Sequence, residues 1–204
     1  MRKIVKGEEP EELSQWKRRH PNKSYKDVTE VERRAIRQAG LNEQYYLCAY
    51  CCYSINEDNS HNEHIHPQHV APNQTLEFHN IVASCNEPKQ CGEAHGAKII
   101  PLTPLMPECE TELKFYLSGK VKGLTERATD TINLLNLGDG NKALINKRKQ
   151  LVDALIFGCG SSPDVIQLLE DELLEIIMEE INQPKDGKLE AFAPILQNIL
   201  RQLI

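Results

Sequence analysis

Cysteine and histidine residues gather in one stretch of this chain. Five of the seven cysteines lie between residues 48 and 91, and six of the seven histidines lie between residues 61 and 95. An odd number of cysteines without a secretory leader argues against a disulfide scaffold. Thiolates and imidazoles are the ligands that zinc prefers in proteins. The clustering therefore predicts that a metal ion organises the fold of this stretch.

Length and composition are typical of a soluble, helix-leaning globular protein. The 204 residues are 40% hydrophobic, 26% charged and 5% aromatic. No apolar run approaches the roughly 20 residues of a membrane helix, and no apolar segment follows the basic start at residues 1–6, as a signal peptide would require. We therefore expect one compact domain, or one small domain with an appendage, in the cytoplasm.

Charge is distributed unevenly along the chain. The overall net charge is −6, which argues against strong unaided binding of nucleic acid. Residues 1–40 hold 11 Lys and Arg against 7 Asp and Glu, whereas residues 151–204 hold 3 against 10. This gradient favours a nucleic-acid surface at the front and a partner surface at the back, although solvated helix faces would produce it equally well.

The local patterns divide the chain into three parts. Residues 1–44 are predicted to form a basic arm, a short helix, and a helix over 27–39 that begins with a capping box of Thr29 and Glu32 and ends at Gly40. Residues 45–100 form the metal-binding core: strand, cysteine turn and strand over 45–55, a strand and loop over 61–71, and a loop leading to a helix or turn over 76–84.

After a proline-rich linker over 99–109, residues 110–204 are predicted to be a helical domain that docks a partner. The periodicity indicates helices near 124–138, 141–157, 163–182 and 190–203. Ser161 or Ser162 is expected to cap the third of these, ahead of Pro163. Cys109 and Cys159 belong to no motif.

The cysteine spacing predicts a zinc knuckle. Cys48 and Cys51 are two residues apart, a spacing at which two thiolates hold one side of a tetrahedral ion. Cys85 and Cys91 are the natural second pair, and Cys52 is the nearest competitor.

Between the two cysteine pairs lie Glu63-His64 and Asn80. A carboxylate beside a histidine, a central asparagine and a final ligand-bearing segment, all held between zinc half-sites, resemble the HNH (ββα-metal) endonucleases. Histidine suits the activation of water near neutral pH, and a divalent ion stabilises the phosphorane and the departing 3′ oxygen.

The resemblance implies a role for each motif residue. His64 matches the general base, Glu63 the acidic ligand of a catalytic Mg²⁺ or Mn²⁺ ion, and Asn80 the residue that fixes the loop. The last ligand is open, because Gly92 follows Cys91 where the family commonly has His or Asn. His95 is the preferred substitute, with Glu93 and Asn86 as alternatives. His61, His66 and His69 are expected to shape the loop or to touch phosphate.

Over residues 1–100 the chain is similar to the PtuB-type HNH nucleases of Septu and retron anti-phage systems. The similarity is carried by the opening residues 1–17, the cysteine turn, the Glu63-His64-Ile65 segment with Pro67, and residues 80–85. It implies an SMC-like ATPase partner of the PtuA type, which the acidic tail would dock. The basic residues expected to follow a phosphate backbone are Lys17, Arg18, Arg19, Lys23 and Lys26, and Arg33, Arg34 and Arg37 would extend the track.

We therefore expect an α+β fold: a small ββα-metal HNH core with a zinc knuckle, an N-terminal helix and an all-α C-terminal region. The expected function is metal-dependent hydrolysis of DNA or RNA as a defence effector. Two alternatives remain open: a stand-alone HNH nuclease of a restriction or mobile element, and a non-catalytic zinc-knuckle adaptor.

Overall fold

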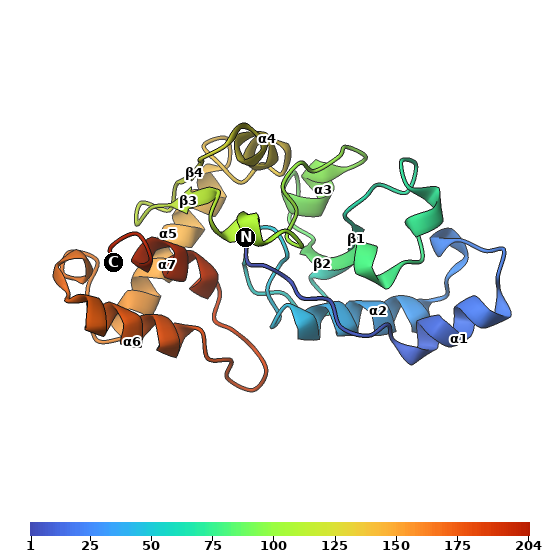
Figure 1. Cartoon of the computed structure of the whole chain (residues 1–204), viewed down its shortest axis with the longest axis horizontal. Coiled ribbons are helices and arrows are strands. Elements are labelled where there is room, and N and C mark those ends of the chain that lie inside the picture. The colour runs from blue at the N-terminus through green and yellow to red at the C-terminus, as the bar shows by residue number, and fades with distance from the viewer.

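The computed structural model of the chain describes residues 1–204 and has an α+β fold with two small antiparallel sheets (Figure 1). The helices are α1 (Glu11–Arg19), α2 (Glu30–Glu43), α3 (Cys91–His95), α4 (Glu126–Leu134), α5 (Lys142–Gly158), α6 (Asp171–Ile181) and α7 (Ala193–Leu200). The strands are β1 (Ser60–His64), β2 (Ile81–Cys85), β3 (Leu113–Phe115) and β4 (Val121–Gly123). None of the helices has both the length and the apolar character that a membrane span requires.

Helix α2 packs against the first sheet and carries the predicted capping box. The Glu32 carboxylate accepts a hydrogen bond from the Thr29 backbone N–H at 3.2 Å, which confirms this helix start. The predicted end at Gly40 is wrong, since the helix continues to Glu43. Gly40 is instead a packing position: a β-carbon there would lie 3.4 Å from the backbone nitrogen of Ala83 on β2.

The first sheet pairs β1 with β2 antiparallel, with Ser60 opposite Cys85 and His64 opposite Ile81. The expectation of a helix or turn at the end of 76–84 is therefore wrong for residues 81–84, and only a 3₁₀ turn at Phe78–Asn80 precedes the strand. Every residue of β2 is buried, and periodicity cannot distinguish such a short apolar run from a buried helical segment.

The cysteine turn over 45–55 is less regular than predicted. The two expected strands reduce to one isolated bridge, between Leu47 and Ser54. Cys52 has a φ of 62°, in the left-handed region, so the chain turns too sharply there for longer strands to pair.

The prediction of an all-α C-terminal region is wrong. Strands β3 and β4 form a hairpin between residues 113 and 123. The predicted helix over 163–182 is also wrong in part. A 3₁₀ turn at Ile166–Leu168 and an extended Leu169 separate α6 from the serines that were expected to cap it. Glu170 is the N-cap of α6.

One continuous hydrophobic core joins the cysteine turn to the C-terminal helices. The backbone N–H of Phe192 donates to the carbonyl of Cys52 at 2.9 Å, and that of Leu189 donates to Tyr45 at 3.1 Å. Figure 1 shows α1 at one end of the molecule and α5 to α7 at the other, with α2 running beneath β1 and β2.

Candidate active site and metal centre

Four buried cysteines converge between α2 and α3. The sulfur atoms of Cys48, Cys51, Cys85 and Cys91 all lie within 4.8 Å of one another. In a tetrahedral zinc site with Zn–S bonds of about 2.3 Å, the sulfurs are roughly 3.8 Å apart. All seven cysteines are free thiols, so no disulfide competes for this group. The four cysteines could therefore hold a metal ion such as zinc, and Cys52 lies outside the group.

Local structure directs the thiols toward one another. Cys48 and Cys51 come from the turn after α2, Cys85 ends β2, and Cys91 begins α3 with a φ of 53°. The backbone N–H of Cys85 donates to the Cys48 sulfur at 3.4 Å, and the Gln90 amide donates to the Cys85 sulfur at 3.8 Å. Donors aimed at sulfur stabilise negative charge there, as expected of thiolate ligands.

The cysteine cluster also fits a cation electrostatically. Burial, together with hydrogen bonds to the other three thiols, raises the pKa of the Cys91 thiol well above its ordinary value. A bound divalent cation offsets this burial penalty and holds the group as thiolates. Zinc is the ion that such a sulfur-only donor set favours.

A second polar cluster lies beside the cysteines, around Glu63 on β1. One carboxylate oxygen lies 2.5 Å from His95 Nδ1 and the other lies 3.2 Å from His61 Nε2. The His95 side chain is fully buried, and that of Glu63 is only 12% exposed. Burial opposes ionisation of Glu63, but the hydrogen bonds from the two histidines hold its pKa below the ordinary value. The cluster therefore retains a buried carboxylate.

Helix α3 brings His95 into this cluster. Cys91 anchors the first turn of the helix, and His95 follows four residues later on the same face. The alternatives to His95 lie elsewhere. The Glu93 carboxylate accepts a hydrogen bond from the Lys89 backbone, and the Asn86 carbonyl oxygen lies 2.7 Å from His61 Nδ1 rather than beside Glu63.

His61, which was expected to shape the loop or to touch phosphate, instead belongs to the cluster around Glu63. It precedes Glu63 by two residues on a strand, so both side chains leave the same face of β1. This two-residue spacing on a strand is the sequence signal that could have placed His61 beside Glu63. Burial opposes the charged form of His61, but hydrogen bonds with Glu63 and Asn86 outweigh it and raise the pKa of His61 above its ordinary value.

His64 ends β1 and is buried against the edge of the Tyr25 ring, with ring centroids 4.6 Å apart. Its Nε2–H donates to the Thr75 carbonyl at 2.9 Å, because a carbonyl can only accept. The lone pair is therefore on Nδ1, which the Gln68 amide approaches at 3.4 Å. Burial lowers the pKa of His64 below its ordinary value. His64 is thus a neutral imidazole near pH 7, able to accept a proton at Nδ1.

An open polar hollow of about 370 Å³ connects His64 with the Glu63 cluster. It is lined by Asn62, Glu63, His64, Pro67, Gln68, His69, Gly96 and Ala97. The proton acceptor and the carboxylate therefore face the same solvent-accessible space. His69 lies at its rim, whereas His66 is exposed and does not line it.

Asn80 closes the loop between β1 and β2. Its side-chain oxygen accepts from the His66 backbone N–H at 2.8 Å, and its amide donates to the carbonyls of His66 and Gln74 at 3.1 and 3.3 Å. This loop also presents the Thr75 carbonyl that orients His64. The Asn80 side chain forms no hydrogen bond with His64 or Glu63, so its influence on the site passes through the loop backbone.

The basic residues of the N-terminal part are partly neutralised within the chain. Lys17 pairs with Glu9 at 2.5 Å, Arg18 with Glu11 at 2.9 Å, and Lys23 with Asp27 at 3.5 Å. Arg19 and Lys26 form no ion pair. Exposed ion pairs are worth about 1 kcal/mol or less, so a phosphate can displace the carboxylate partners.

The neighbouring arginines of α2 face inward or pair locally. Arg33 donates to the carbonyls of Val28 and Tyr25, and Arg34 pairs with Glu57 at 2.8 Å. Arg37 donates to the Glu57 carbonyl at 3.3 Å. These contacts leave Arg33 and Arg37 less available to a nucleic acid than the residues of α1.

The C-terminal region carries a separate surface that is both acidic and apolar. Residues 150–184 contain eight Asp and Glu and no Lys or Arg. Large apolar side chains are exposed in the same segment, at Phe157, Val165, Leu168, Leu173 and Ile176. We call residues 157–176 with these side chains the acidic–apolar surface. Exposed apolar side chains gathered in this way mark interaction sites.

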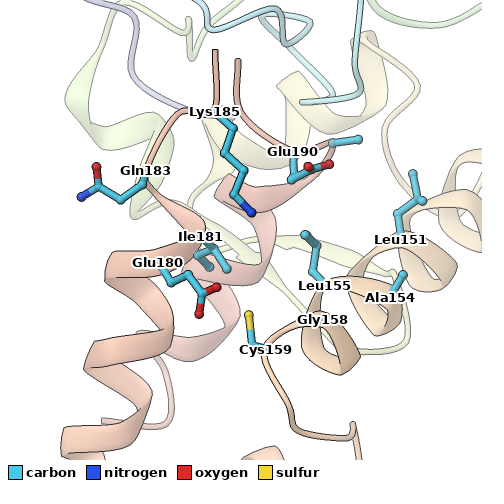
Figure 2. A pocket seen from close by; sticks show the side chains of 11 residues that line it. Leu151, Ala154, Leu155, Gly158, Cys159, Glu180, Ile181, Gln183, Lys185 and Glu190 are labelled. Carbon is cyan, nitrogen blue, oxygen red and sulfur yellow. The ribbon is translucent and has the colours of Figure 1, made fainter. Parts of the chain in front are cut away.

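A hollow of about 300 Å³ adjoins this surface, between α5, α6 and residues 183–191. Figure 2 shows the Lys185 side chain extending into it between Ile181 and Leu155, with Cys159 at one edge. A second hollow of about 370 Å³ shares Cys159 and is lined by Val165, Leu169, Leu173 and Ile177. The surface is therefore concave on both sides of Cys159.

No protein-family model matches this chain, and no curated protein matches it by sequence.

Proposed function

We propose that this protein is a metal-dependent HNH endonuclease that hydrolyses phosphodiester bonds in nucleic acid. The observation that carries the proposal is that His64, whose lone pair is on Nδ1, and the Glu63 carboxylate line one polar hollow, while the buried His95 contacts Glu63 from behind it. The order β1, β2, α3, with cysteines around it, supports the resemblance to ββα-metal nucleases.

In the proposed reaction, His64 takes a proton at Nδ1 from a water molecule, and the resulting hydroxide attacks the phosphorus. Thr75 holds the ring in the tautomer that this step needs. Glu63 and His95 would hold the catalytic ion, which when bound supplies positive charge for the phosphorane and the departing 3′ oxygen. The four cysteines would hold a structural zinc that fixes α3 against β2.

The substrate class is DNA or RNA, without sequence readout by the site itself. The Lys17, Arg18, Arg19, Lys23 and Lys26 side chains would contact phosphates along the backbone. The net charge of −6 keeps unaided affinity low. The chain would thus bind nucleic acid only weakly by itself, and a partner protein would concentrate it on its substrate.

We infer that the partner is an SMC-like ATPase and that the pair acts in anti-phage defence in the cytoplasm. The acidic–apolar surface is the site where such a partner would dock, because it offers exposed apolar side chains in a segment whose charged residues are all acidic. The competing proposals are a stand-alone HNH nuclease and a zinc-knuckle adaptor. An SMC-like ATPase gene directly upstream, whose product co-purifies with this chain, would favour the defence role over the stand-alone nuclease.

The test of the nuclease proposal is cleavage by zinc-loaded wild type, His64→Ala and His79→Ala, with and without the co-expressed ATPase. His79 is an exposed histidine outside the hollow, which makes it the matched control. Plasmid, single-stranded DNA and structured RNA each serve as substrate. We expect cleavage by wild type and His79→Ala only. Equal cleavage by folded His64→Ala would overturn the mechanism, and no cleavage by any sample with any substrate would favour the adaptor.

A further inference from the structure

Gly92 lies next to the cluster around Glu63. The side chains of His61 and Glu63 fill the space where a β-carbon of residue 92 would lie. A β-carbon placed on Gly92 would lie 2.6 Å from His61 Nε2 and 2.8 Å from Glu63 Oε2. Real β-carbons essentially never make contacts this close, so a side chain at position 92 would push the His61 imidazole or the Glu63 carboxylate, or both, out of place and break their contact. A glycine at position 92 therefore leaves the space in which His61 and Glu63 meet.

In His61 and in His95, the ring nitrogen that points away from Glu63 donates a hydrogen bond to an oxygen atom. His61 Nδ1 donates to the Asn86 side-chain oxygen at 2.7 Å, and His95 Nε2 donates to the Lys98 carbonyl. This leaves His61 Nε2 and His95 Nδ1 directed at the two oxygens of Glu63. Histidines that bind metals almost always donate their other N–H to a carbonyl or carboxylate, which fixes the tautomer and the ring orientation.

We propose that His61, Glu63 and His95 together form a divalent-cation site with two imidazole ligands and one carboxylate. The proposal rests on the nuclease function above and adds to it the third ligand and the class of metal. His61 Nε2 takes the position that a side chain at 92 would otherwise occupy, and Gly92 is the steric requirement for that exchange. Asn86 and the Lys98 carbonyl act as positioning groups behind the two imidazoles.

The donor set determines which ion the site prefers. Imidazole nitrogen suits first-row transition ions, whereas Mg²⁺ prefers oxygen ligands and retains its waters. Two nitrogens and one carboxylate therefore favour Mn²⁺ over Mg²⁺. The open hollow beside Glu63 leaves the remaining coordination positions accessible to water and to a phosphate oxygen.

The test is a titration of the zinc-loaded full chain with Mn²⁺, followed by the electron paramagnetic resonance signal of free Mn²⁺. We expect wild type and His79→Ala to bind one Mn²⁺ per chain, with Mg²⁺ competing at least tenfold more weakly. His61→Ala and His95→Ala should each weaken Mn²⁺ binding by at least about 10- to 100-fold, which is the range for removing a group that only orients a metal ligand. Gly92→Ala should weaken it in the same way, because its β-carbon displaces His61.

The outcomes separate this inference from the nuclease function. Mn²⁺ binding by folded His61→Ala as tight as that of wild type overturns the inference, whether or not the protein cuts. Loss of binding in His61→Ala supports it, even if no sample cleaves nucleic acid, in which case only the proposed function fails. Zinc content and circular dichroism verify folding of each variant, and if Gly92→Ala does not fold, the comparison of His61→Ala with His79→Ala decides.

Discussion

The Nδ1 atom of His95 lies 2.5 Å from Oε1 of Glu63, although 32 residues separate them in the chain. The contact joins strand β1 to helix α3, and Cys91 anchors the first turn of the same helix in the cysteine cluster. The cluster around Glu63 and the cysteine cluster therefore share helix α3. Anything that loosens the cysteines is expected to move His95 away from Glu63.

The first prediction concerns zinc. Purified protein should contain one zinc per chain, and Cys51→Ser should lose it. Because binding energy at such sites is folding energy, we expect the free energy of unfolding to fall by several kcal/mol, or roughly 10 °C in melting temperature. Metal analysis and thermal unfolding measure both quantities.

Cys159→Ser is the matched control, since Cys159 is half-buried and lies outside the cluster. It should retain zinc and melt close to wild type. A Cys51→Ser variant that still held one zinc with full stability would contradict the four-cysteine site.

The second prediction concerns Asn80. Asn80→Ala removes one acceptor and one donor and leaves the backbone groups of His66 and the Gln74 carbonyl without their partner. We expect a loss of stability of about 1–3 kcal/mol and faster amide hydrogen exchange over residues 65–80. Zinc content should stay unchanged, because the cysteines lie outside this loop. Unchanged exchange in the loop would show that Asn80 does not hold it.

The third prediction is a pH effect at the hairpin–helix junction. Hydrogen bonds from Arg127, at 2.9 Å for Nε, and from Thr125 lower the pKa of Glu112 to about 2. Because the folded-state pKa lies below the unfolded value, this contact stabilises the protein above about pH 4.5, and the contribution is lost as pH falls toward 2.

Arg127→Ala should therefore raise the pKa of Glu112 toward its ordinary value, as carboxyl-carbon NMR titration would measure. The variant should also lose less stability than wild type between pH 5 and pH 3. A Glu112 titration that the substitution does not shift would show that the ion pair does not form in solution.

The fourth prediction concerns the acidic–apolar surface. The double substitution Leu168→Asp and Ile176→Asp places charge on side chains that are 81% and 59% exposed, so the fold should tolerate it. We expect at least tenfold weaker binding to the ATPase partner by surface plasmon resonance. Val31→Asp, on the exposed face of α2, is the control with similar exposure. Equal partner binding by the double variant would place the docking site elsewhere.

The sequence predicted the parts of this structure that depend on short spacings. The pairing of Cys48 and Cys51, the capping box at Thr29 and the presence of a short helix after the arm are local patterns. His95 was the preferred candidate for the last ligand, and the structure places its side chain, buried, beside Glu63.

The rest depended on tertiary context that no local pattern contains. β2 is buried along its whole length and has no alternation to mark it as a strand. Gly40 resembles a helix terminator in the sequence but serves close packing against Ala83. Likewise His61 joins Glu63 only because Gly92, across the site, leaves room for it. Each of these features requires knowledge of which segment lies opposite.

The measurement that tests the central claim most directly is chemical rescue of His64. Single-turnover cleavage is compared for wild type, His79→Gly and His64→Gly, each folded and zinc-loaded, with and without added imidazole. General-base catalysis contributes about 10²- to 10⁴-fold, so His64→Gly should lose activity by that factor, and imidazole should restore part of it. A His64→Gly protein that cuts at the wild-type rate, or that stays inactive at every imidazole concentration while His79→Gly cuts normally, would contradict the assignment of His64 as the base.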